Sequence, residues 1–298
     1  MDTVYLFSVS PDTPPAMRIM PGEAFTIEIR GAFDDVTDIG AIPTPFTPAS
    51  EGHPLAPISG PVAVEGAMPG DSVVVELQSI TPHGMGSNAI LRKFGVLAED
   101  FPDPRIINCP VRDGRAWFGE KVPIPLYPNL GTVSTMPPEG YKPSYAGPYG
   151  GDFDQRDVCQ GCRVHLPVMV PDALVFFADP HAVISDGVVS GTGVECAVTA
   201  EIRVQLDKGR ALDRPVIEHE KTIQVVGTGP SVEAATEDAT RGTVELLAAR
   251  SELSPEEAYM LLGIVGELRV GTSPRPIMAA RLIVPLEVLA HVGWRGLA

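Results

Sequence analysis

Apolar and polar residues alternate along several short stretches of this chain. Every second side chain is apolar in residues 24–30 (AFTIEIR), in residues 201–206 (EIRVQL) and, more loosely, in residues 73–77 (VVVEL). Because successive side chains of a strand point to opposite faces, each stretch predicts a strand with one buried and one solvated face. Antiparallel sheets favour that arrangement. We therefore predict a mostly β protein with antiparallel β-sandwich-like sheets, with more than about 35% of the residues in strands, against roughly 20–25% in an average soluble domain.

Helical signals gather near the C-terminus, whereas 31 prolines and 30 glycines interrupt the rest of the chain too often for long helices. Ser231 can cap a helix that runs to about Arg250, with apolar residues at helical spacing along one face. The run Ser254-Pro255-Glu256-Glu257 matches a capping box with proline at the first helical position. We predict a helical hairpin at residues 231–266, within one domain that covers residues 1–298.

The segment between residues 130 and 157 is rich in Pro, Gly and Tyr. A loop of that length is rarely an inert connection, so it indicates either a functional loop or a sub-division of the domain. Beyond it, residues 164–170 and 174–177 are apolar runs that we expect to pair as a hairpin, with the binding loops at its rim.

Net charge excludes two classes of partner. The formal charge of −16 and the sequence pI near 4.7 oppose binding to nucleic acid or to an anionic membrane surface. The apolar runs are too short for a membrane-spanning helix, and residues 1–10 show no secretory signal, so we expect a cytoplasmic protein.

The four cysteines, at positions 109, 159, 162 and 196, are too few for a disulfide framework, and free structural thiols are the favoured interpretation. Cys159 and Cys162 have the spacing of half a zinc site or of a redox pair, but the sequence has no second CxxC and no βαβ pattern around this one.

Two groups of residues can carry chemistry. Gly150 and Gly151 precede Asp152 and Asp154, whose carboxylates would point to the same side of an extended segment and suit a cation; an ordinary acidic turn is the alternative. Asp179-Pro180-His181 ends an apolar run, and a histidine near a carboxylate can serve as base, acid or metal ligand.

Five blocks along the whole chain, in the same order, resemble the acetamidase/formamidase family. They are GPVAVEGAMPGDSVVVEL (60–77), FGVLAEDFP (94–102), VPIPLYPNLG (122–131), LPVMVPDALVFFADPHA (166–182) and LSPEEAYMLLGIVGELRV (253–270). The resemblance implies hydrolysis of the carbon–nitrogen bond of a small linear amide, in an enzyme that forms a homo-oligomer.

The resemblance also implies site residues. The family pattern Gly-Gly-Asn-x-Asp matches here at Asp154 but not at Asp152, and its Gly-Asp-x-His-Ala matches at Asp179 and His181. A further pattern, Gly-Asp-Gly-Glu, matches at Asp186, and a downstream acid matches at Glu195.

Two family carboxylates are absent, because Val188 and Gly31 stand at their positions. An amidase needs groups that activate water and protonate the amine, so these departures leave two hypotheses open. The first is an amidohydrolase with a diverged active site, and the alternative is an inactive family member that acts as a small-molecule binding or assembly protein.

For the enzyme we expect a divalent metal, zinc or calcium, bound by Asp154, Asp179 and His181. Asp179, His181 and Asp186 would be catalytic. Gly150, Gly151, Asp152 and Glu195 would bind the small-molecule substrate. If one site holds the ligands, the side chains of Asp154 and His181 should lie within about 8 Å of each other.

Overall fold

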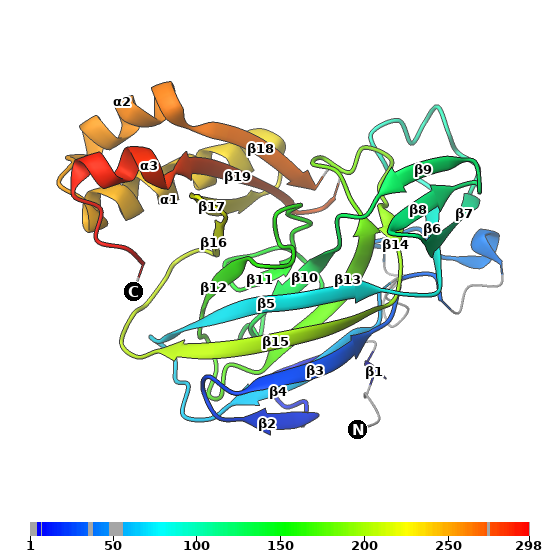
Figure 1. Ribbon diagram of the computed structural model, residues 1–298, viewed down its shortest axis with the longest axis horizontal. Coiled ribbons are helices and arrows are strands. Elements are labelled where there is room, and N and C mark those ends of the chain that lie inside the picture. The colour runs from blue at the N-terminus through cyan, green and yellow to red at the C-terminus, as the bar shows by residue number, and fades with distance from the viewer. Residues whose placement is uncertain (1–4, 7, 35–37, 48–55, 273–274, 298) are drawn as a thin grey trace.

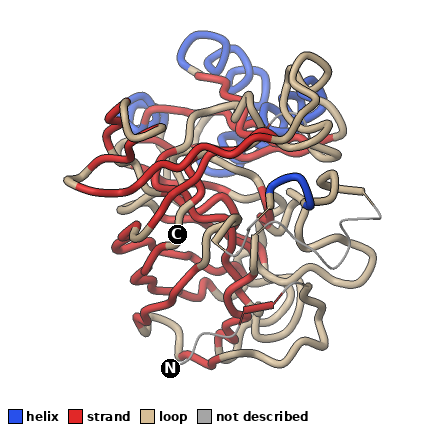
Figure 2. Tube along the Cα trace, turned by 90° about the vertical axis from the view of Figure 1, so that its right-hand side faces the viewer, coloured by secondary structure: helices blue, strands red, loops and turns tan. Residues whose placement is uncertain are grey.

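The computed structural model describes residues 5–6, 8–34, 38–47, 56–272 and 275–297. Strands account for 41% of the structure, which confirms the prediction of a mostly β protein. In the described part of the chain the strands form two sheets, and all their pairings are antiparallel except β2 with β4. Helices α1 (Val232–Arg250), α2 (Pro255–Val265) and α3 (Leu286–Leu289) gather at one end of the molecule, opposite strands β6 to β9 (Figure 1), and Figure 2 shows the strands that make up most of the rest.

The larger sheet follows the order β1-β4-β13-β14-β6-β7-β8-β9, with β10 paired to both β13 and β11, and β2 paired to β4. Its strands are β1 (Tyr5–Leu6), β2 (Met17–Ile19), β4 (Ile58–Val64), β6 (Met85–Ile90), β7 (Arg105–Arg112), β8 (Arg115–Phe118), β9 (Val122–Pro125), β10 (Asn129–Ser134), β11 (Gly150–Asp152), β13 (Val175–Val183) and β14 (Val194–Glu195).

The second sheet follows the order β18-β19-β17-β16-β12-β5-β15-β3. Its strands are β3 (Ala24–Ile29), β5 (Ser72–Pro82), β12 (Arg163–Pro167), β15 (Val198–Asp207), β16 (Val216–His219), β17 (Thr222–Gly229), β18 (Glu267–Thr272) and β19 (Met278–Pro285). The alternating sequences of residues 24–30, 73–77 and 201–206 thus fall in three neighbouring strands, β3, β5 and β15.

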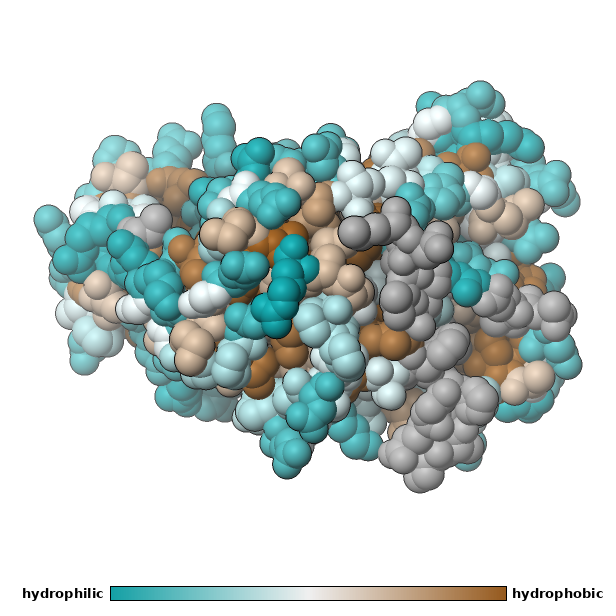
Figure 3. All heavy atoms as spheres, turned by 90° about the horizontal axis from the view of Figure 1, so that it is seen from below, coloured by the Kyte–Doolittle hydropathy of each residue, from teal (hydrophilic) through white to brown (hydrophobic). Residues whose placement is uncertain are grey.

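The main core lies between the two sheets. Val62 of β4 and Phe177 of β13 pack in one buried cluster with Val75 of β5, Val164 of β12 and Ile202 of β15, all without solvent exposure. Two sheets joined through their apolar faces form the predicted sandwich. The face seen in Figure 3 is mostly hydrophilic, with apolar residues scattered between the polar ones.

The predicted helical hairpin is confirmed. Helix α1 (Val232–Arg250) begins at the N-cap Ser231, whose side chain accepts from the backbone N–H of Ala234. Helix α2 (Pro255–Val265) begins at the complete capping box of Ser254 and Glu257. Helix α1 packs on β17 and β19, and α2 packs on α1 and β19, through a second apolar cluster that includes Leu247 and Leu262.

The described residues also form three short helical segments: η1 (Ile39–Ala41), α3 (Leu286–Leu289) and η3 (Ala290–Val292). No helix among the described residues is long and apolar enough to cross a membrane.

Two sequence interpretations need correction. Residues 130–157 are not one loop, because β10 and β11 lie within them; β10 is buried on both faces and therefore shows no alternation. The apolar runs 164–170 and 174–177 do not form a hairpin. The first contributes β12 to one sheet and the second contributes β13 to the other, so they face each other across the core.

Candidate functional site

Strand β10 brings the candidate residues together. On one edge it pairs with β13, so that Asn129 lies opposite His181. On its other edge it pairs with β11, so that Thr132 lies opposite Asp152. The segments that carry Asp154 and His181, 27 residues apart in sequence, thereby meet across a single strand. We expected Asp179 and His181 in a loop at the rim of the sheet, but they lie within the buried strand β13.

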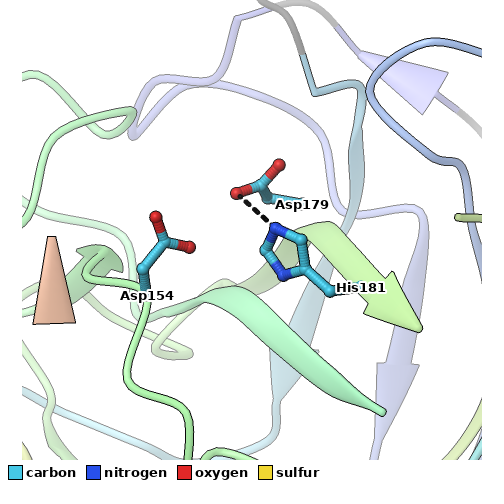
Figure 4. Close-up of side chains that lie close together, drawn as sticks. All are labelled: Asp154, Asp179 and His181. Atoms are coloured by element: carbon cyan, nitrogen blue, oxygen red, sulfur yellow. Dashed lines mark ion pairs between the residues drawn. The ribbon is translucent and has the colours of Figure 1, made fainter. Parts of the chain in front are cut away.

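Asp154, Asp179 and His181 offer one ligand atom each, and these atoms all lie within 4.8 Å of one another. The predicted proximity of Asp154 and His181 is confirmed. Figure 4 shows the three side chains directed toward a common space between them. All three are buried, and both aspartates have a positive φ, 44° for Asp154 and 55° for Asp179. Such backbone strain is often retained at functional sites.

Gly131, in the middle of β10, provides the floor of this space. A Cβ on Gly131 would overlap Asp154 Oδ1 and would lie 2.7 Å from Asp179 Oδ2. Only a hydrogen at this position leaves room for the two carboxylates to face each other. The pair Asp154 Oδ1 and Asp179 Oδ2 is thus a cradle that any side chain at position 131 would fill.

The imidazole of His181 is oriented by Asn129. Asn129 Nδ2 donates to the carbonyl of Gln155, which directs Oδ1 toward His181 Nδ1 at 2.9 Å. Nδ1–H therefore donates to Asn129, and Nε2 faces Glu195 Oε1 at 3.2 Å and Asp179 Oδ2 at 3.6 Å. A histidine fixed in this way through one nitrogen presents the other to a metal or a proton.

The electrostatics of the site are dominated by buried carboxylates. Burial raises the pKa of the Asp152 carboxyl to about 7, although the nearby guanidinium of Arg275 opposes this. Burial and the charge of Glu195 raise the pKa of Asp179 well above its usual range. Burial alone would lower the pKa of His181, but the charges of Glu195 and Asp179 raise it to about 10. The site is short of positive charge, so the carboxyl groups of Asp152 and Asp179 release their protons less readily than free ones.

A divalent cation fits this donor set. Three buried carboxylate oxygens, Asp152 Oδ1, Asp154 Oδ1 and Glu195 Oε2, have no hydrogen-bond partner. Buried polar groups are normally paired, so orphaned carboxylate oxygens in one cluster indicate a ligand. Oxygen and imidazole ligands suit zinc, and carboxylates with few nitrogens suit calcium.

Arg275 closes one side of the cluster. Its Nη1 donates to Asp152 Oδ2 and its Nη2 to Asp154 Oδ2, both at 2.5 Å. Its guanidinium also lies 5.4 Å from the ring centre of Phe46 and 5.3 Å from that of Phe94. Charged and aromatic groups therefore hold this side chain from two directions.

Asp186, predicted to be catalytic, lies outside this cluster. Its Oδ1 accepts from the fully buried Arg281 at 2.7 Å, and its Oδ2 accepts from Arg269 at 3.3 Å. Arg281 also donates to Gln155 and Asp157, which links this network to the segment that carries Asp154. The geometry gives Asp186 a supporting position rather than a place among the candidate ligands.

The predicted substrate-binding residues separate into two pairs. Asp152 and Glu195 lie in the cluster, whereas the positions of Gly150 and Gly151 are explained by packing: their φ angles are 101° and 83°, and a Cβ on either would collide with backbone oxygens. Only glycine tolerates both conditions.

The structure also places the two departures from the family pattern. Val188 is buried at 4% exposure. Gly31 donates its N–H to Asp34 Oδ2 at 2.9 Å, so a carboxylate from three residues further along lies beside the position that lacks one.

Sequence reasoning missed three residues. Asn129 and Gly131 end the block VPIPLYPNLG, so the resemblance contained the signal, but nothing in residue type pointed to a role. Arg275 follows β18, more than 90 residues after His181, and no spacing linked it to the carboxylates.

The cysteines take no part in the cluster. All four are buried and free, as expected. Cys162 lies in the main core, and Cys159 Sγ lies 3.3 Å from His219 Nε2. Among the described residues, the one group with metal-site geometry contains no cysteine.

Comparison with known proteins connects this site to a family. The sequence matches the Acetamidase/Formamidase family over residues 8–142 and 133–290. It is 24% identical to an acetamidase from Mycolicibacterium smegmatis over 271 residues, which cover 67% of this chain and 65% of the relative. The chain thus spans slightly less than two thirds of the length of that relative.

The fold agrees over nearly the whole chain. A recombinant predicted acetamidase/formamidase from Thermoanaerobacter tengcongensis superposes with a TM-score of 0.89 at 27% identity, covering 98% of this chain and 96% of that one. An acetamidase from Bacillus halodurans gives a TM-score of 0.88 at 28% identity, covering 98% and 97%.

Proposed function

The chain belongs to the Acetamidase/Formamidase family, and from this premise we propose that it hydrolyses the carbon–nitrogen bond of a small linear amide. One observation carries the proposal. The ligand atoms of Asp154, Asp179 and His181 converge within 4.8 Å in a buried cluster of carboxylates. Such a cluster costs folding free energy unless a ligand compensates for it, so function is the better explanation of its presence.

Asp154, Asp179 and His181 would hold a divalent ion, zinc or calcium. When bound, such an ion supplies a water of lowered pKa and polarises the carbonyl of the amide. The chain supplies the orientation. Asn129 fixes the ring of His181 through Nδ1, and Gly131 leaves room for the facing oxygens of the two aspartates.

Glu195 is the best placed proton carrier. Amide hydrolysis requires one group to take a proton from water and to return it to the leaving amine. Glu195 Oε1 accepts from the backbone N–H of Gly193 at 2.9 Å, while Oε2 is buried and has no partner. The free oxygen can accept a proton and donate it again without a change of rotamer. The family pattern has an acid at the position of Val188, which could have transferred this proton. We infer that Glu195 transfers it in this chain.

Burial of the cluster favours short substrates. The residues Asp154, His181 and Glu195 are 0%, 1% and 4% exposed, so a bulky acyl chain has no room beside them. Formamide, acetamide and propionamide form the natural test series, and activity should fall as the acyl group lengthens.

Ammonia release from these amides tests the proposal. Metal-free protein would be assayed alone and with added zinc, calcium or manganese. Activity should require one ion and should fall by at least about 100-fold in Glu195→Gln, as is typical when a general acid–base group is removed. His291→Ala is the matched control, because His291 lies in η3, away from the cluster, and should leave the rate unchanged.

No turnover of any amide by the folded, metal-loaded protein would refute the hydrolase. If that protein still bound short amides, the result would favour the alternative function, a family member that binds small molecules without catalysis. Turnover in metal-free protein at the full rate would refute the metal centre alone.

We also propose that the protein assembles as a homo-oligomer. Helix α2 presents an apolar face to solvent, with Tyr259, Met260 and Ile264 exposed by 64%, 71% and 80%. Apolar patches of this kind often mark protein interfaces. Sedimentation should give an oligomer for the native chain and a smaller species for Met260→Glu with Ile264→Glu. A monomeric native chain would refute this part.

A further inference from the structure

Arg275 places a positive charge inside the carboxylate cluster. Its side chain is only 11% exposed, and each terminal nitrogen donates to a different aspartate, Asp152 or Asp154. Both acceptors are the Oδ2 atoms, and the two Oδ1 atoms stay buried and unpartnered. Arg275 is thus a resident cation that binds one oxygen of each carboxylate, so that the other oxygen of each remains available to a ligand.

Asp154 is the residue shared between Arg275 and the candidate metal site. Its Oδ2 accepts from Arg275, while its Oδ1 faces Asp179 Oδ2 over Gly131. An ion on Oδ1 at the usual 2.0–2.6 Å would lie only about 5–6 Å from the guanidinium. Two cations at that separation, in a site with little water, repel each other strongly.

Asp152 has the opposite effect to Arg275 on the charge of the site, because its carboxyl group favours a bound cation. It adds a fourth carboxyl group to those of Asp154, Asp179 and Glu195, in a cluster where Arg275 is the resident cation. Loss of Asp152 would leave Arg275 paired with Asp154 alone. The pair of Arg275 and Asp152 is therefore neutral in total, and each member shifts the affinity of the site for a cation.

We propose that Arg275 and Asp152 set the metal affinity of this site, with Arg275 competing with the metal ion for the negative charge of Asp154. This inference rests on the proposed metal centre. Arg275 holds the metal-free cluster together and weakens ion binding, so that the ion exchanges rather than being held permanently. Arg275 is a positioning residue, since it acts through Asp154.

Calorimetric titration of metal-free protein with zinc, repeated with calcium, tests the proposal independently of activity. Arg275→Met should bind the ion at least tenfold more tightly than the native chain, and Asp152→Asn at least tenfold more weakly. The double variant restores the native total charge and should return to within about threefold of native affinity, because each change offsets the other. The matched control is Arg269→Met, which removes the same charge from the neighbouring strand β18, where Arg269 is 39% exposed and pairs with Asp186 and Glu267. Its affinity should not change.

Weaker binding in Arg275→Met would overturn the inference, since it would mean that Arg275 orients Asp154 for the ion. Equal affinity in the native chain, both single variants and the double variant would overturn it as well. If neither the native chain nor any variant binds zinc or calcium, the proposed metal centre itself fails, which is a distinguishable result. Circular dichroism of each metal-free variant checks folding. If Arg275→Met does not fold, Arg275→Gln, which removes the charge but keeps a donor, should bind more tightly than the native chain, and weaker binding would overturn the inference.

Discussion

Gly131 is the position where one added carbon tests the geometry of the site most directly. The φ of Gly131 is not in the left-handed region, so alanine fits the backbone and the effect of Gly131→Ala is purely steric. The new Cβ would overlap Asp154 Oδ1 and approach Asp179 Oδ2 to 2.7 Å and the backbone oxygen of Asp179 to 2.9 Å. Both carboxylates must move, and the backbone at Asp179 in β13 must also give way by a few tenths of an ångström.

The size of the displacement gives the expected effect. Ordinary contacts begin near 3.4 Å, so Asp179 Oδ2 must retreat by about 0.7 Å, well beyond the roughly 0.2 Å tolerance of metal–ligand distances. We expect zinc affinity to fall by at least about 100-fold, which corresponds to about 2.7 kcal/mol. Overpacking should lower the free energy of unfolding by about 1–3 kcal/mol.

Calorimetry measures the affinity, and thermal unfolding of the metal-free protein measures the stability. A matched control is Gly263→Ala in α2, where an added Cβ meets no atom within 4 Å. That change should leave zinc affinity unchanged and stabilise the exposed helix by up to about 1 kcal/mol. Native affinity in Gly131→Ala would refute the claim that Asp154 Oδ1 and Asp179 Oδ2 are ligands of one ion.

Three further predictions concern the residues that support the site and the sheets. Asn129→Ala removes the acceptor of His181 Nδ1–H, so metal affinity or ammonia release should fall by about 10–100-fold, while unchanged values of both would contradict the orienting role. Arg281→Met removes the fully buried cation that pairs with Asp157 and Asp186 and should lower the free energy of unfolding by about 3–5 kcal/mol, measured by urea titration; a loss below 1 kcal/mol would show that the pairs contribute little. Asp71 is buried; burial raises its pKa, but the hydrogen bond from Lys208 and two from backbone N–H groups outweigh it and hold the pKa below 3.8. Since the folded pKa is depressed, the stability that Asp71 contributes should be present above about pH 4 and should disappear as the pH falls through the folded pKa. Asp71→Asn should therefore be less stable than the native chain by about 1–3 kcal/mol at pH 7, and the two stabilities should converge at low pH. A difference in stability that stays constant with pH would contradict this assignment.

Short-range sequence patterns were enough to predict strands β3 and β15 and the starts of helices α1 and α2. Residues 24–30 and 201–206 alternate because β3 and β15 each cover the core with one face, and that periodicity is a property of the strand alone. Ser231 and Ser254 begin α1 and α2 because their side chains satisfy N–H groups only three residues away. Such short-range rules do not depend on the rest of the chain.

The candidate ligands were identified by residue type and by resemblance, and their convergence was confirmed, but by a different route from the one expected. The sequence indicated a hairpin of residues 164–170 and 174–177. Asp154 and His181 meet instead because β10 pairs with both β11 and β13. Strand pairing depends on long-range hydrogen bonds that leave no periodic trace in sequence, and β10 is fully buried and does not alternate.

Arg275 marks the boundary between what the sequence by itself determined and what only the tertiary structure decided. The sequence determined a mostly β chain, the helical hairpin, and Asp154, Asp179 and His181 as candidate ligands, because strand periodicity, capping and residue chemistry act over a few residues. Tertiary structure decided that Arg275 pairs with Asp152 and Asp154, positions more than 120 residues earlier. A buried ion pair is formed by whichever side chains the sheets bring into contact, and its electrostatics depend on burial, which is a property of the whole fold.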